Sequence, residues 1–107
     1  MKFVNLTPHT INVMDSEGKG ELLVVPPSGS IARVAVSYNR APDVEGIPVY
    51  VAVYGDVEGV PAAKDDVFFI VSGLVESRIQ RSDIFSPGDL VRNSEGRPVG
   101  CKGLKQS

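Results

Sequence analysis

The sequence is short of the residues on which many sites are built: among 107 residues there is one cysteine, one histidine and no tryptophan. Cys101 has no partner for an internal disulfide, which favours a reducing compartment and the role of a small core residue. Structural zinc takes four Cys or His ligands and the chain has two such residues, so no metal or other cofactor is expected. A catalytic triad has only His9 to use as its base.

Long apolar runs and runs of like charge are also lacking. No apolar stretch approaches the ~20 residues that span a bilayer, and the first residues lack the apolar core of a signal peptide. The formal net charge is −2 and the basic residues are scattered along the chain, whereas binding of duplex nucleic acid needs a clustered basic face. We expect a cytoplasmic protein that binds neither membranes nor duplex nucleic acid.

What the sequence does contain is a series of strand signals separated by turns. Alternating apolar residues predict a hairpin over residues 10–25 and strands over Ser30–Val36, Ile47–Tyr54 and Val67–Val71, with a last hairpin after Leu90. Residues 39–46 and 55–66 have the composition of loops, and Ser86–Asp89 fits a type II turn. The sequence therefore predicts a mainly β fold, a small barrel or sandwich of about seven short strands, in one domain spanning residues 1–104 with a disordered tail at 105–107.

Two features add detail to this fold. A short helix is expected over Leu74–Gln80 with Ser72 as its N-cap, so that Val67–Gln80 followed by Leu90–Arg92 has the order of a βαβ crossover. The strand Ile47–Tyr54 has apolar or aromatic residues on both faces, which is typical of a central strand or one covered on both sides.

Charged and aromatic residues supply a candidate ligand site. Arginine binds phosphate oxygens in a bidentate manner, hydroxyls and base edges need polar partners, and tyrosines on one strand face stack on bases. The alternative for the arginines and the aspartate is a structural salt-bridge network, and for the histidine a turn residue after Pro8. The candidate ligand-binding residues are His9, Arg33, Tyr50, Tyr54, Arg81, Asp83 and Arg92.

Several stretches of the chain together resemble a group of small proteins encoded by bacteriophages and prophages. The matching stretches are Asn5-Leu6-Thr7-Pro8-His9, Pro26-Pro27-Ser28-Gly29 with Ala32-Arg33, Tyr54-Gly55 with Glu58-Gly59, Phe69-Ile70-Val71-Ser72, and Arg81 to Arg92 with Gly100-Cys101. The resemblance implies a phage accessory protein acting in the host cytoplasm. It transfers no activity.

Three functions remain open at this stage. The first is a non-catalytic binder that sequesters a small anionic, nucleotide-type ligand, in the manner of a counter-defence sponge, with unpaired sheet edges favouring a homo-oligomer. The second is a structural or interaction module, either a virion component or an inhibitor of a host protein. The third is a phosphoester hydrolase with His9 as base, disfavoured because no nucleophile motif or second histidine accompanies it.

Overall fold

The fold is described by a computed structural model that covers residues 2–106. Within that range the chain forms eight strands and one short helix. The elements are β1 (Lys2–Asn5), β2 (Ile11–Met14), β3 (Glu21–Val25), β4 (Arg33–Val44), β5 (Ile47–Glu58), β6 (Val67–Ile70), α1 (Gly73–Ser77), β7 (Ile84–Arg92) and β8 (Pro98–Lys105).

Six of the strands make one curled sheet in the order β1-β6-β7-β8-β2-β3, and β4 pairs with β5 alone. The two edges of the large sheet approach each other where Asn5 forms a parallel bridge with Pro27. There the amides of Ser28 and Ala32 donate to the carbonyls of Asn5 and Leu6, at 3.0 and 2.9 Å. The sheet is nearly closed, which confirms the prediction of a mainly β, barrel-like fold.

The β6–α1–β7 segment is a βαβ crossover, in the order that the sequence predicts, because β6 and β7 are parallel. The predicted second strand, Leu90–Arg92, is wrong in detail: Ile84 and Phe85 pair with β6, whereas Leu90–Arg92 pair with β8. The helix is shorter than the predicted 74–80. Ser72 caps it by accepting a hydrogen bond from the Val75 amide at 3.4 Å, and Arg78 already ends it. Five residues do not sustain a helix alone, so packing of the fully buried Val75 holds it against the sheet. No helix within residues 2–106 is long and apolar enough to cross a membrane.

The core lies between this crossover and the start of β4. Its members are buried aliphatic and aromatic side chains contributed by β4, β6, α1, β7 and the loops next to these elements and to β1: Leu6, Ala32, Val34, Phe69, Val71, Val75 and Ile84. On the opposite face of the β1-β6-β7 strands, Phe3, Phe68 and Phe85 pack with ring centroids 5.7–6.4 Å apart. Alternation along short parallel strands therefore gives both faces an apolar cover.

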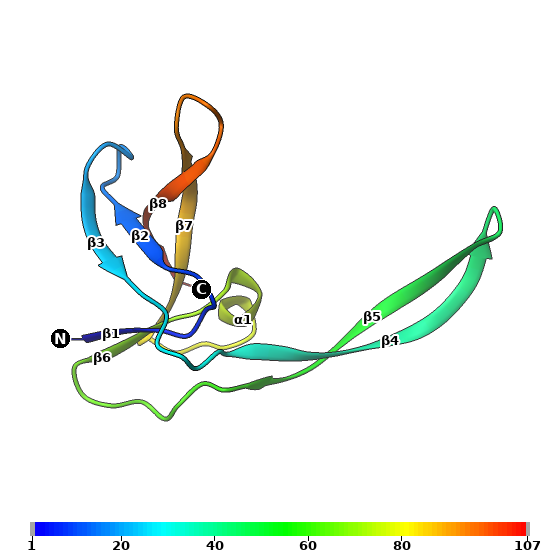
Figure 1. Cartoon of the computed structure of the whole chain (residues 1–107). Helices are drawn as coiled ribbons and strands as arrows, with labels where there is room; N and C mark the ends of the chain where they lie inside the picture. Colours follow the sequence, from blue (N-terminus) through cyan, green and yellow to red (C-terminus); the bar gives the residue numbers. More distant parts are fainter. Residues whose placement is uncertain (1, 107) are drawn as a thin grey trace.

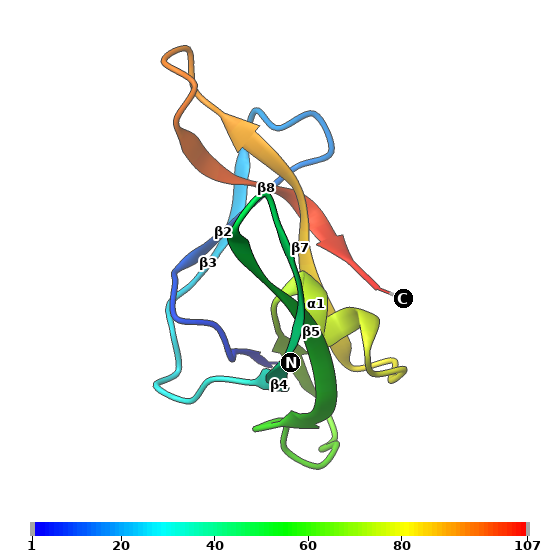
Figure 2. The same cartoon turned by 90° about the vertical axis from the view of Figure 1, so that its right-hand side faces the viewer.

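The most distinctive element is the β4–β5 hairpin, which leaves the body as a long arm (Figure 1). Viewed along the arm, the barrel-like body lies behind it (Figure 2). Each strand has 12 residues, and they pair from Arg33↔Glu58 to Val44↔Ile47 around a turn with positive φ at Glu45 and Gly46. Only Val34 and Val57, at the base of the arm, pack with the core.

The arm corrects two expectations. Residues 39–46 were predicted as a loop and instead continue β4 to the turn, because cross-strand pairing satisfies their backbone without burying their polar side chains. Ile47–Tyr54 was predicted to be central or covered on both sides, but within one chain it is an exposed strand of a two-stranded sheet. The predicted loop 55–66 also starts late, since β5 runs to Glu58.

A third correction concerns Ser86–Asp89, which lies inside β7 and forms no turn. Pro87 and Asp89 pair with Leu104 and Lys102 of β8. Proline is tolerated here because β6 pairs with β7 only as far as Phe85, so at Pro87 the strand is bonded on one side alone and its missing amide hydrogen need not break the ladder. Glycine is required next to it because Gly88 lies against the backbone of β8.

The two predicted hairpins, over residues 10–25 and after Leu90, are confirmed, and the same kind of side-chain hydrogen bonding stabilises both of their turns. The Asp15 carboxylate accepts from the amides of Glu17, Lys19 and Gly20 between β2 and β3. The Asn93 side chain accepts from the amides of Glu95 and Arg97 between β7 and β8.

The expected tail at residues 105–107 falls partly within the ordered sheet. Lys105 is the last residue of β8, and the Gln106 side chain donates to the Ser82 carbonyl at 2.8 Å. Ser107 lies outside the described residues.

Candidate functional site

The arm has two chemically different faces, because successive side chains of a strand point to opposite sides. We call one the tyrosine face: Val36, Tyr38 and Arg40 of β4 lie opposite Tyr54, Ala52 and Tyr50 of β5. We call the other the valine face: Ile47, Val49, Val51 and Val53 of β5, with Ala41, Asn39 and Ser37 opposite the last three. The sequence prediction that Tyr50 and Tyr54 share a face is confirmed.

The tyrosine face alternates rings with guanidinium groups. Tyr38, Tyr50 and Tyr54 are 64%, 60% and 43% exposed. The Arg40 guanidinium carbon lies 5.5 Å from the centroid of the Tyr50 ring, and that of Arg78 lies 4.8 Å from the Tyr54 ring. Tyr38 and Tyr50 line an open hollow of about 320 Å³. The face thus presents flat, polarisable rings with a guanidinium group at each end.

The two guanidinium groups differ in how far they are neutralised. Arg40 forms an exposed ion pair with Asp43 at 2.6 Å. Arg78 lies at the end of α1, where its backbone amide caps the helix, while its side chain makes no ion pair or hydrogen bond within residues 2–106. The Arg78 guanidinium therefore lies over the Tyr54 ring with N–H donors that no acceptor within residues 2–106 takes up, and such donors are available to an anion.

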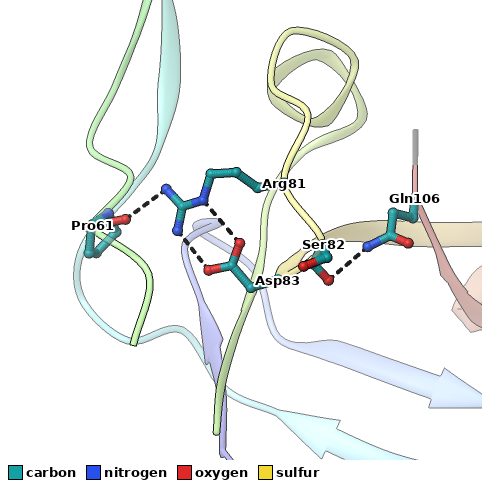
Figure 3. Close-up of polar contacts among 5 residues, drawn as sticks. All are labelled: Pro61, Arg81, Ser82, Asp83 and Gln106. Carbon is teal, nitrogen blue, oxygen red and sulfur yellow. Dashed lines mark hydrogen bonds and ion pairs between the residues drawn. The ribbon is translucent and has the colours of Figure 1, made fainter. Parts of the chain in front are cut away.

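Of the other predicted site residues, Arg81 and Asp83 are brought together but hold each other (Figure 3). The Arg81 guanidinium donates to both Asp83 oxygens, at 3.0 and 2.6 Å, and to the Pro61 carbonyl at 3.0 Å. The pair tethers the chain after β5 to the start of β7, beside a hollow of about 390 Å³. In this geometry three of the five Arg81 N–H donors are used within the chain, and the Asp83 carboxylate neutralises its charge.

The Arg81–Asp83 pair gives stability a defined pH dependence. The hydrogen bond from Arg81 lowers the pKa of Asp83 below its ordinary 3.8, so the pair stabilises the fold above that pH and is lost as pH falls through the lower folded value. We expect Asp83→Asn to lower stability near neutral pH by about 1–3 kcal/mol and to flatten the loss of stability below about pH 4. Urea unfolding across that pH range measures both effects, and an unchanged acid limb would contradict the assignment.

His9 lies at the rim of a different hollow, of about 490 Å³, lined mainly by apolar parts of β2, β7 and β8. Its backbone carbonyl accepts from the side chains of Asn5 and Thr7, at 2.7 and 3.0 Å. Cys101 also lines this hollow. Its sulfur lies 3.7 Å from the Asn12 carbonyl, and burial raises the pKa of its thiol. A buried thiol of raised pKa is a weak nucleophile, as expected for a core cysteine.

Arg33 and Arg92 complete the predicted set and lie in other places. Arg33 is the exposed first residue of β4, opposite Glu58. Arg92 is at the end of β7, where it donates to the Gly96 carbonyl at 2.8 Å. A single chain therefore brings Tyr50 and Tyr54 to one face and joins Arg81 to Asp83, while the three arginines do not share a hollow among the described cavities. Across residues 2–106 no three Cys, His, Asp or Glu side chains are grouped as metal ligands.

Tyr38 and Arg40 of the tyrosine face, and Arg78 of α1 beside it, were not in the predicted set. Reading residues 39–46 as strand would have placed Tyr38 and Arg40 opposite Ala52 and Tyr50 around the Glu45-Gly46 turn. No local signal identifies Arg78, because its contact with Tyr54 depends on how the helix packs against the arm.

Searched against protein-family models, curated proteins and solved structures, the chain has no match in any of the three.

Proposed function

We propose that this protein is a non-catalytic binder of a small anionic, nucleotide-type ligand, which it sequesters in the cytoplasm of a phage-infected cell. The observation that carries the proposal is the exposed tyrosine face, with three rings and the unneutralised Arg78. The phage context comes from the sequence resemblance alone. This assignment relocates the ligand from the arginines predicted by sequence to the arm.

The spacing of the rings suits a flat heterocycle. Tyr38 is diagonal to both Tyr50 and Tyr54, since it pairs with Ala52 between them. Diagonal neighbours on a sheet face lie ~7–8 Å apart, which is about two carbon–carbon contact distances. One base therefore fits between two of the rings, and base–aromatic stacking contributes ~1–3 kcal/mol per base.

Phosphates would then extend toward the ends of the face. Arg78 presents guanidinium donors above Tyr54, and Arg40 presents a half-exposed guanidinium above Tyr50. Arginine binds phosphate in planar, bidentate geometry. Stacking and charge pairing give affinity without a nucleophile or metal, so sequestration is the simplest outcome of such a site.

The experiment is a thermal-unfolding screen of mononucleotides, cyclic dinucleotides and ADP-ribose, with uncharged nucleosides alongside. A true ligand at 100 times its Kd adds about 2.7 kcal/mol to stability and raises Tm by several degrees. We expect Tyr50→Leu and Arg78→Gln to weaken binding about tenfold or more. Arg97→Gln, which removes only an exposed pair with Glu95, is the matched control and leaves affinity unchanged.

The same sample tests sequestration against turnover. Ligand released by heat and measured by mass spectrometry returns intact if the protein only binds it. No response to any phosphate-bearing compound, or full affinity in Tyr50→Leu, would overturn the proposal.

A second candidate function is an interaction module for a virion or host protein. It is favoured by the same exposed arm, since a large apolar surface is typical of a docking surface. Absence of any small-molecule response together with stable binding of one such protein through the tyrosine face would favour this function over the first.

A further inference from the structure

The three rings of the tyrosine face are evenly spaced along the arm. Tyr50 and Tyr54 are separated by four steps of β5, which places their backbones ~13 Å apart. Tyr38 of β4 pairs with Ala52, which is midway between them. All three tyrosines are exposed, and the ring pairs found within residues 2–106 all belong to the phenylalanine cluster of the body. No ring of the described chain therefore fills the two gaps between successive tyrosines.

The length of the row matches a stack of three rings and two bases. In the order Tyr50, base, Tyr38, base, Tyr54 there are four contacts between neighbouring layers. Atoms in contact are ~3.5 Å apart, so the stack is ~14 Å long, in agreement with the ~13 Å between the outer tyrosines. The gap between Tyr38 and Tyr50 is the open hollow of about 320 Å³. A single base would fill only one of the two gaps.

Two bases are also the most that the row can hold. The chain has three tyrosines and no tryptophan, and its phenylalanines lie in the body. The ends of the row are marked by guanidinium groups, with Arg40 5.5 Å from the Tyr50 ring and Arg78 4.8 Å from the Tyr54 ring. A third base would find no further ring at either end, whereas a phosphate would find an arginine.

We propose that the ligand of this face is a dinucleotide, linear or cyclic, bound with one base on each side of Tyr38. The inference rests on the proposed function and names its ligand class. Successive bases of a stacked strand lie ~3.4 Å apart, and one inserted ring raises that separation to ~7 Å. Side chains inserted between base steps unstack them in this way. Opposite Tyr38 is Ala52, whose short side chain leaves room beside the ring for the sugar–phosphate link.

Calorimetric titration of the 5′-phosphorylated linear dinucleotide pApA and of ADP tests the ligand class. The two compounds have similar charge and differ by one nucleoside, and adenine is a suitable probe because stacking accepts any base. The second base should make pApA bind about tenfold more tightly than ADP, or better. The trinucleotide pApApA should show no comparable further gain. Cyclic di-AMP tests the closed form of the link, and a preference for either dinucleotide over ADP supports the inference.

Variants of two tyrosines locate the bases. Tyr54→Leu removes one gap, so it should lower the affinity for pApA about tenfold and affect ADP much less. Tyr38→Leu removes both gaps and should weaken both compounds. Tyr54→Phe, which keeps the ring and loses only the hydroxyl, is the matched control and should retain the preference for pApA. Thermal unfolding without ligand shows whether each variant is folded, and the wild-type comparison depends on none of them.

The outcomes separate this inference from the proposed function. ADP binding as tightly as both dinucleotides would overturn the inference and leave the proposed function standing. A trinucleotide that gains as much over pApA as pApA gains over ADP would also overturn it, because the face would then be a platform for longer strands. Failure of every phosphate-bearing compound to bind would overturn the proposed function, and this inference with it.

Discussion

Asn5→Asp should be one of the most destabilising single changes in the chain, although the two side chains have the same shape. The Asn5 amide donates to the carbonyls of His9 and Val25, at 2.7 and 2.9 Å, and its oxygen accepts from the Thr7 amide and hydroxyl. The residue is 1% exposed. A carboxylate there would face two carbonyl oxygens it cannot bind.

The expected cost follows from those groups. Each acceptor left unpaired costs ~1–3 kcal/mol, and a buried charge without a partner adds to it. We expect a loss of about 4 kcal/mol or more near neutral pH, which is a large fraction of the ~5–15 kcal/mol that stabilises an ordinary domain. Urea unfolding monitored by circular dichroism measures it.

Two comparisons make this result specific. Asn5→Ala removes the same hydrogen bonds without adding charge, so it should be less harmful than Asn5→Asp at neutral pH. The disadvantage of Asn5→Asp should shrink as pH falls, since a protonated carboxyl donates one hydrogen bond. Asn12→Asp, which loses one exposed bond to the Val99 carbonyl, is the control. Equal stability of Asn5→Asp and Asn12→Asp would contradict the role given to Asn5.

Gly88→Ala is the second change with a large expected effect. A Cβ at Gly88 would lie inside the contact radius of the Lys102 carbonyl oxygen and 3.0 Å from the Gly103 carbonyl oxygen. Both atoms are backbone, so β8 would have to move away from β7. Overpacking of this kind costs ~1–3 kcal/mol, and lost ladder hydrogen bonds raise the total to about 3 kcal/mol or more.

Gly73→Ala provides the matched control. Gly73 begins α1, and no atom lies within 4 Å of a Cβ built there. Because its backbone is not left-handed, alanine should be neutral or stabilise by up to ~1 kcal/mol. Thermal unfolding of the two variants measures the contrast, and a Gly88→Ala protein as stable as Gly73→Ala would refute the close approach of β7 and β8.

The parts of the fold that sequence predicted well are those fixed by local chemistry. Asp15 and Asn93 end strands by binding nearby amides, and the apolar Val67–Val71 run can only be buried. The prediction for the arm was wrong for the opposite reason, because local chemistry does not determine its structure. Its polar residues, such as Asn39 and Asp43, resemble a loop because the hairpin exposes both faces and so imposes no burial pattern on β4. The turn predicted at Ser86–Asp89 was wrong because its glycine allows a close contact between two strands and does not mark a turn.

The sequence predicted the candidate site correctly only for residues that lie on one strand. Alternation places Tyr50 and Tyr54 on one side of β5, and the structure agrees. The arginines were grouped by residue type, yet the Arg81 guanidinium is satisfied by a carboxylate two residues away, and Arg78 reaches Tyr54 through tertiary packing. Whether a charge is free or neutralised depends on its three-dimensional neighbours, which composition does not report.

The order β1-β6-β7-β8-β2-β3 interleaves strands from before and after the arm. Cleavage of the chain at the Glu45-Gly46 turn, the point farthest from the body, would yield two fragments, each of which contains some of the strands of the same barrel. Neither fragment could complete that sheet alone, and each would supply the neighbours the other lacks. The chain is thus organised as two complementary halves joined at an outlying bend, so its continuity there matters less to the body than the pairing of the halves.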